Sequence, residues 1–137
     1  MPINLSHHKL LADKIVLIDG VARTGKTLVS KVLPSFHRFE QIEYAEFIEH
    51  ILAGLRLNKV KNDFAQSFIA NTLNEQFYNK LLGRKLNFRP SDITSVKKFK
   101  KENVYEKRLL MPEGDNVIKR LKKNKNFFPF MTHDVMV

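Results

Sequence analysis

The residues with the clearest capacity for chemistry form the run Gly20-Val-Ala-Arg-Thr-Gly-Lys-Thr27. Gly20 permits a tight departure from a preceding strand, and Gly25 lets the backbone approach an anion with no Cβ in the way. Successive N–H groups of such a loop face inward. A helix starting at Lys26 adds N-terminal donors and the positive end of its dipole. The spacing therefore predicts a phosphate-binding loop.

The side chains of this run suit the same ligand. Lys26 can reach terminal phosphate oxygens as a mobile point charge, and Arg23 can hold an oxyanion through two parallel hydrogen bonds. Thr27 can ligate either Mg²⁺ or a phosphate oxygen. We therefore expect a nucleotide or a similar anionic ligand.

A second group of reactive residues, Thr132-His133-Asp134, directly follows the apolar run Phe127 to Met131. If that run is a strand, these residues lie at its carboxyl end, which is the edge where open parallel sheets bind ligands. The predicted loop leaves the sheet at the same edge. Arg89 projects from the turn-forming run Asn87 to Asp92, where it could contact an anionic substrate or form a salt bridge.

Several strands must position these groups. Ile15 to Asp19 is apolar on both faces, as in a central parallel strand. Phe36 to Ile42 could form a short second strand. Phe127 to Met131 is predicted to be the next buried strand, with Pro129 placed where the sheet needs no hydrogen-bond donor.

Helices account for most of the remaining chain. Lys26 to Leu33 is predicted to be the first helix, ended by Pro34. Two longer helices follow, the second capped by Asn62 or Asp63 and ended by Gly83 at C′. Their apolar stripes, which we assign to the core, contain Tyr44, Phe47, Ile48, Ile51, Leu52 and Leu55, then Phe64, Phe68, Ile69, Leu73, Phe77 and Leu81.

The last third of the chain is less regular. Residues Arg84 to Leu110 show no clean period. Pro112 to Lys123 reads as an amphipathic helix whose inward side chains are Val117, Ile118 and Leu121.

These elements predict an α/β fold, in which helices flank a parallel sheet in three layers and a largely helical insertion follows the first strand and helix. Only two or three strands are visible, and such sheets usually contain more. We therefore expect residues 1–137 to form a single nucleotide-binding domain that is the incomplete N-terminal part of a longer protein.

Composition restricts the classes of function. The chain has 137 residues, of which 43% are hydrophobic, and it contains no cysteine, which excludes disulfides and thiolate sites and fits a reducing cytoplasm. No signal peptide or membrane-spanning run is visible. The net charge of +10 favours anionic partners. The lysine-rich runs are interpreted as solvated faces, since no nucleic-acid recognition signature accompanies them.

Two pieces of the sequence resemble one family. The block Arg23-Thr24-Gly25-Lys26-Thr27 resembles the loop with which sulfotransferases hold the 5′-phosphosulfate of 3′-phosphoadenosine 5′-phosphosulfate (PAPS). Thr132-His133 is similar to the Thr-His element that supplies the catalytic base in cytosolic sulfotransferases. Lys26 departs from the family, whose loops commonly carry a small hydroxyl residue at that position.

The resemblance implies a role for each matching residue. The 5′-phosphosulfate would be bound by Arg23, Thr24, Gly25 and Thr27. Lys26 would neutralise charge on the bridging oxygen as the sulfuryl group leaves. His133 would take the proton from a hydroxyl or amine acceptor, which could be a carbohydrate, a lipid or another small molecule.

Two other functions fit the same residues. Gly20…Gly25-Lys26-Thr27 is equally the loop of an ATP-dependent small-molecule kinase or NTPase, with Mg-ATP as the ligand and Thr27 on the metal. Asp134 would then be a metal or base carboxylate, although it could simply cap a helix. A third alternative is a nucleotide-binding module without catalysis.

Overall fold

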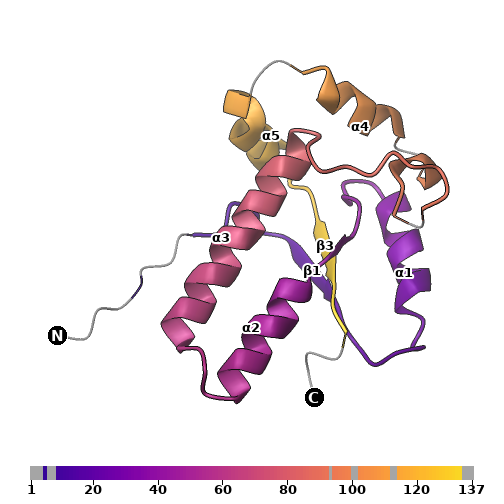
Figure 1. Cartoon of the computed structure of the whole chain (residues 1–137). Coiled ribbons are helices and arrows are strands. Elements are labelled where there is room, and N and C mark those ends of the chain that lie inside the picture. Colours follow the sequence, from indigo (N-terminus) through magenta and orange to yellow (C-terminus); the bar gives the residue numbers. More distant parts are fainter. Residues whose placement is uncertain (1–4, 6–8, 93, 100–101, 112–113, 134–137) are drawn as a thin grey trace.

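The computed structural model describes residues 5, 9–92, 94–99, 102–111 and 114–133 of the chain (Figure 1). They form an α/β fold around a small parallel sheet. The strands are β1 (Ile15–Ile18), β2 (Glu43–Tyr44) and β3 (Phe128–Met131). The α-helices are α1 (Lys26–Val32), α2 (Glu46–Arg56), α3 (Asn62–Leu81), α4 (Glu102–Leu109) and α5 (Val117–Asn124), and single 3-10 turns occur at Leu33–Ser35, Val96–Lys98 and Gly114–Asn116.

The strand order within the described sheet is β1-β3-β2, and both pairings are parallel. Every residue of β3 is buried, whereas β1 is only partly buried and its Leu17 is 47% exposed. The prediction of a central first strand is therefore wrong for this sheet, in which β3 takes the central place. Figure 1 shows α1 on one side of the sheet and α2 and α3 on the other.

The core lies between β3 and the two helices α3 and α5. The ring of Phe77 on α3 contacts Phe128 and Phe130 at centroid distances of 4.5 and 5.5 Å. These two strand residues share one face because side chains alternate along a strand. Val117 and Leu121 of α5 complete the cluster. By contrast, Ile118 is 42% exposed, so its predicted inward position is wrong.

Helix α3 begins and ends close to the predicted positions. Gly83 has a φ of +78°, and the N–H of Arg84 donates to the carbonyl of Asn79 at 2.8 Å. The predicted glycine stop is thus confirmed. The N-cap is Lys61 instead of Asn62 or Asp63.

Only part of each predicted apolar stripe reaches the core. On α3, Leu73, Phe77 and Leu81 are buried, whereas Phe64 and Phe68 remain more than a third exposed and stack on each other 5.8 Å apart. The apolar stripe predicted for α2 also includes Tyr44, and this part of the prediction is wrong because Tyr44 belongs to β2.

The predicted strand from Phe36 to Ile42 is also wrong. This segment makes a single bridge, between Phe39 and Phe127, and regular pairing begins only where Glu43 aligns with Phe130. It therefore contains one residue more than β3 between these two pairs, as in a β-bulge.

Pro129 lies opposite the bulge. Backbone N–H groups point to alternate sides along a strand, and those of Phe128 and Thr132 donate toward β1. The backbone nitrogen of Pro129 therefore faces the bulged segment on the other side of β3. The Gln41 backbone bonds elsewhere: its N–H donates to the Tyr105 hydroxyl at 2.7 Å, and its carbonyl accepts from Lys80 Nζ at 2.6 Å. The missing donor of Pro129 is thus accommodated inside the sheet.

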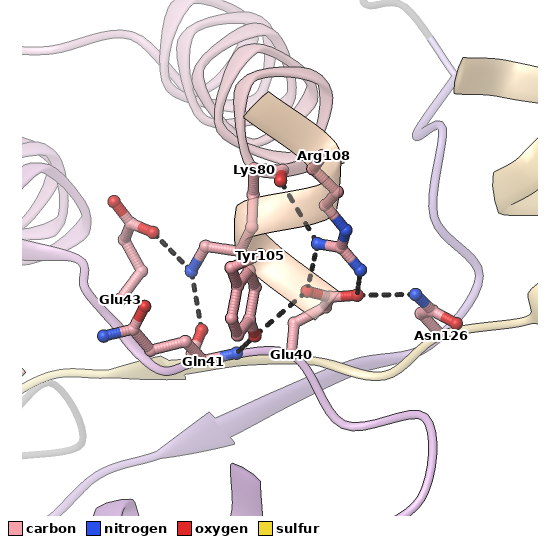
Figure 2. A network of polar contacts seen from close by, with 7 residues as sticks. All are labelled: Glu40, Gln41, Glu43, Lys80, Tyr105, Arg108 and Asn126. Atoms are coloured by element: carbon pink, nitrogen blue, oxygen red, sulfur yellow. Dashed lines mark hydrogen bonds and ion pairs between the residues drawn. The ribbon is translucent and has the colours of Figure 1, made fainter. Parts of the chain in front are cut away.

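A buried ion pair fixes this irregular edge (Figure 2). Glu40 is 2% exposed, and its two carboxylate oxygens accept hydrogen bonds from Arg108 of α4 at 2.7 and 2.8 Å. The Asn126 amide donates to the same carboxylate at 2.5 Å, and Lys80 pairs with Glu43 at 2.5 Å. The network thereby joins four parts of the chain: the sheet edge, the end of α3, helix α4, and Asn126 just before β3.

The ionisation of Glu40 follows from these contacts. Burial raises the pKa of the Glu40 carboxyl, but the hydrogen bonds and the positive charge of Arg108 outweigh burial, so the pKa is lower than usual. Burial and the negative charge of Glu40 together raise the pKa of Tyr105. The carboxylate is therefore charged and the phenol neutral in the folded chain.

The same network explains a helix that the sequence pattern does not reveal. In α4 a single side chain, Tyr105, is fully buried, and Arg108 makes the other inward contact. A helix attached through polar groups shows no apolar period.

Helix α5 begins at Val117, after a 3-10 turn. The helix was predicted to begin at Pro112, which lies outside the described residues.

We predict that Glu40→Gln lowers the free energy of unfolding by about 3–5 kcal/mol, because it leaves the buried Arg108 charge without its partner. Urea unfolding at neutral pH measures the loss. Glu75→Gln is the matched control, since it breaks the Lys85–Glu75 pair, whose side chains are 63% and 62% exposed and whose loss should change stability little. Equal stability of the Glu40→Gln variant and the wild type would contradict a buried ionised pair.

This difference should depend on pH. Because folding lowers the pKa of Glu40, its contribution is fully present above the unfolded value of 4.5 and is lost as pH falls through the lower folded value. The free-energy gap between wild type and Glu40→Gln should therefore begin to narrow as pH falls below about 4.5 and should close once pH is below the lower folded pKa. A gap that instead narrows toward alkaline pH would show that another group is responsible.

Candidate functional site

The predicted loop connects β1 to α1, and its two glycines have conformations that other residues rarely adopt. Gly20 has a φ of +141°, and a Cβ placed there would lie 3.2 Å from Thr24 Oγ1. Gly25, the N-cap of α1, has a φ of +87°, and an added Cβ would meet no atom within 4 Å. Backbone conformation therefore requires glycine at both positions, and the space over Gly25 is open to a ligand.

Lys26 folds over the loop. Its ammonium donates to the carbonyl of Gly20, and the residue is 8% exposed. The exposed Thr24 Oγ1 donates to the Val21 carbonyl at 2.9 Å within the turn. Arg23, with a φ of +65°, and Thr27 are both exposed. The loop thus carries one cation at its centre and one at its rim.

The end of β3 is joined to the start of the loop. Thr132 is fully buried; its N–H donates to the Ile18 carbonyl at 3.0 Å, and its hydroxyl donates to Asp19 Oδ1 at 2.8 Å. Asp19 immediately precedes Gly20, and Thr132 immediately precedes His133. The loop and the histidine, predicted to share one edge of the sheet, are therefore held at adjacent strand ends.

Within the described part of the chain, Glu49 and Tyr44 contact His133 there. The N–H of His133 donates to Glu49 Oε1 at 2.5 Å, and its Nδ1 lies 3.4 Å from the same oxygen. The ring stacks on Tyr44 with a centroid distance of 6.0 Å and an interplanar angle of 6°. Sequence reasoning missed Glu49 and Tyr44 as site residues. Their signal was positional, since Tyr44 is the last residue of β2 and Glu49 follows it in the first turn of α2, at the same sheet edge.

The structure does not bring the candidate residue Arg89 to this site. Arg89 is exposed, and its N–H donates to Asn87 Oδ1 at 2.9 Å, in a turn that the Asn87 amide ties to Thr94 at 2.9 Å. No described contact joins that turn to the loop or to His133. Asp134 lies outside the described residues.

A cavity of about 390 Å³ lies away from the loop, beside Glu40 and Arg108 at the start of β3. Its rim carries the cations Arg38 and Lys123. It therefore adjoins the buried ion pair, at the opposite end of β3 from His133.

Two absences concern only the described part of the chain. No group of three or more His, Asp, Glu or Cys side chains is placed there to hold a metal ion. No helix among these residues is long and apolar enough to span a membrane.

Comparison with known proteins found no matching family model, no matching curated protein and no matching solved structure. The proposals below therefore depend on the residues and their geometry.

We predict that Thr132→Val destabilises the fold by about 1.5–3 kcal/mol, because it keeps the shape of the side chain but removes a buried donor to a carboxylate. Thr132→Ser keeps the hydroxyl and should lose about 1 kcal/mol or less. The measurement is urea unfolding, with amide chemical shifts of Gly20 reporting on the loop. Thr27→Val, at an exposed threonine, is the control. A Val variant as stable as the wild type would mean that the contact with Asp19 contributes nothing.

Proposed function

We propose that this chain belongs to a sulfotransferase-like group transferase, which moves a sulfuryl group from PAPS to a hydroxyl or amine acceptor. The supporting observation is the hydrogen bond between Thr132 and Asp19, at 2.8 Å. It holds a glycine-rich loop suited to phosphate and a histidine suited to proton transfer at one edge of a parallel sheet. Phosphate binding and general-base chemistry are the two requirements of such a transfer.

The loop residues would bind the 5′-phosphosulfate. Backbone N–H groups around Gly25 approach the anion, since nothing fills the space above that glycine. Lys26 already has its ammonium within the loop, on the Gly20 carbonyl. An anionic oxygen is a stronger acceptor than a carbonyl, so Lys26 would transfer its hydrogen bond to the ligand.

The transfer itself needs one proton acceptor and one cation. The acceptor oxygen or nitrogen attacks sulfur, and the bond from sulfur to the bridging phosphate oxygen breaks with its electron pair on that oxygen. Lys26 would stabilise the negative charge developing there. His133 would accept the proton from the attacking group.

An ATP-dependent small-molecule kinase or NTPase is the second candidate. It is favoured by the Asp19 carboxylate directly before the loop and by the exposed Thr27 hydroxyl, since both are oxygen ligands of the kind that Mg²⁺ binds. The remaining ligands would come from water and phosphate oxygens. A nucleotide-binding module without catalysis would bind the same ligands but transfer nothing.

Calorimetry separates the first two candidates. The sulfotransferase proposal predicts that 3′-phosphoadenosine 5′-phosphate binds with equal affinity in Mg²⁺ and in EDTA. The competing kinase proposal predicts binding of ATP that is lost in EDTA. Tight Mg-ATP binding together with no heat from the bisphosphate would overturn our proposal.

Substitutions test the two assigned residues. Lys26→Ala should weaken nucleotide binding by about tenfold or more, given the energy of a charge-assisted hydrogen bond, whereas Lys31→Ala, at an exposed lysine of the same helix, should leave it unchanged. His133→Ala should reduce transfer of labelled sulfate by about 100-fold or more with nucleotide affinity retained. Unchanged turnover would remove His133 from the mechanism.

A further inference from the structure

The exposed histidine at the end of β3 is held more firmly than its surface position requires. His133 is 53% exposed at its side chain, yet one carboxylate oxygen of Glu49 contacts both its backbone nitrogen and its ring nitrogen Nδ1. The ring of Tyr44 lies nearly parallel to the imidazole, at a centroid distance of 6.0 Å. Three different elements, β2, α2 and the end of β3, thus converge on one imidazole.

Glu49 is well placed to hold the His133 ring, because the residue before α2 is hydrogen-bonded to β3, the strand that His133 follows. The N–H of Ala45 donates to the Met131 carbonyl at 2.9 Å, and the Ala45 carbonyl accepts from Ile48 at 2.9 Å in the first turn of α2. Ala45 is fully buried. The base of α2 and the end of β3 therefore share one anchor, and Glu49 follows only one turn later.

The contact with Glu49 favours one of the two neutral forms of the His133 ring. An ionised carboxylate can only accept hydrogen bonds, so a hydrogen on Nδ1, 3.4 Å from Glu49 Oε1, is favoured over a lone pair there when the ring is neutral. The other nitrogen, Nε2, then has a free lone pair. In this tautomer Nε2 is the nitrogen that can accept a proton.

We propose that Glu49 is a positioning residue that holds neutral His133 in its Nδ1–H tautomer, with Tyr44 restricting rotation of the ring. The tautomer assignment depends only on the contacts of His133. Its consequence for catalysis, that Nε2 receives the proton of the acceptor, rests on the proposed function.

The tautomer can be measured directly on the whole chain. Long-range ¹H–¹⁵N correlation spectra distinguish protonated from unprotonated ring nitrogens, and His133→Gln assigns the signals among the five histidines. At a pH where the ring is neutral, the wild type should show protonated Nδ1 and unprotonated Nε2. Glu49→Ala should shift the population toward protonated Nε2.

Two further variants exclude simpler explanations. Glu49→Gln keeps a carbonyl acceptor and should retain the Nδ1–H tautomer, so it serves if Glu49→Ala folds poorly. Glu46→Ala removes an exposed carboxylate from the same first turn of α2 and should change nothing. A wild type with protonated Nε2, or a Glu49→Ala variant that keeps the wild-type tautomer, would overturn the proposal.

Activity provides an independent second test. If sulfuryl transfer is observed, Glu49→Ala should lower kcat by about 10-fold to 100-fold, as part of the contribution of a general base, with the KM for the nucleotide within about twofold. If no transfer occurs while the wild type still shows the Nδ1–H tautomer, the proposed function fails and the role of Glu49 stands. A loss of nucleotide affinity alone would show that Glu49 acts on the loop instead.

Discussion

The buried pair between Glu40 and Arg108 is the contact on which the described architecture most depends. The sheet has strands of only four, two and four residues, too few for ladder hydrogen bonds to fix every element. The ion pair compensates by joining residues 68 positions apart. Removal of either partner would leave a buried charge, so the two segments must stay together.

The polar network around this pair also resolves a local conflict in the sheet. Pro129 occupies the central strand, where a proline normally breaks the ladder. The bulge opposite Pro129 releases the Gln41 backbone, and Tyr105 and Lys80 satisfy its polar groups. These two residues belong to the same network as Glu40, so one polar cluster accommodates the proline and fixes α4 against the sheet.

Stability and candidate chemistry are thereby separated along β3. The ion pair lies near the start of the strand, whereas Thr132 and His133 lie at its end. Because β3 is buried and central, the core and the network hold most of its length in place. The site can then keep an exposed histidine and an open glycine loop without weakening the fold.

The sequence alone determined the features that depend on near neighbours. The glycines of the loop, the extent of α3 with Gly83 at its end, and the position of His133 after an apolar strand all follow from spacing over a few residues. Such patterns are readable because helices, turns and strand alternation are local.

Tertiary structure decided the rest. The central place of β3, the bulge before β2, the helix α4 and the contact of Glu49 with His133 depend on pairs that are far apart in the chain. The residues around one member of such a pair contain no pattern that identifies the other member. Glu40 and Arg108 look like ordinary surface charges until folding buries them together, because their pairing energy exists only after the intervening helices have packed.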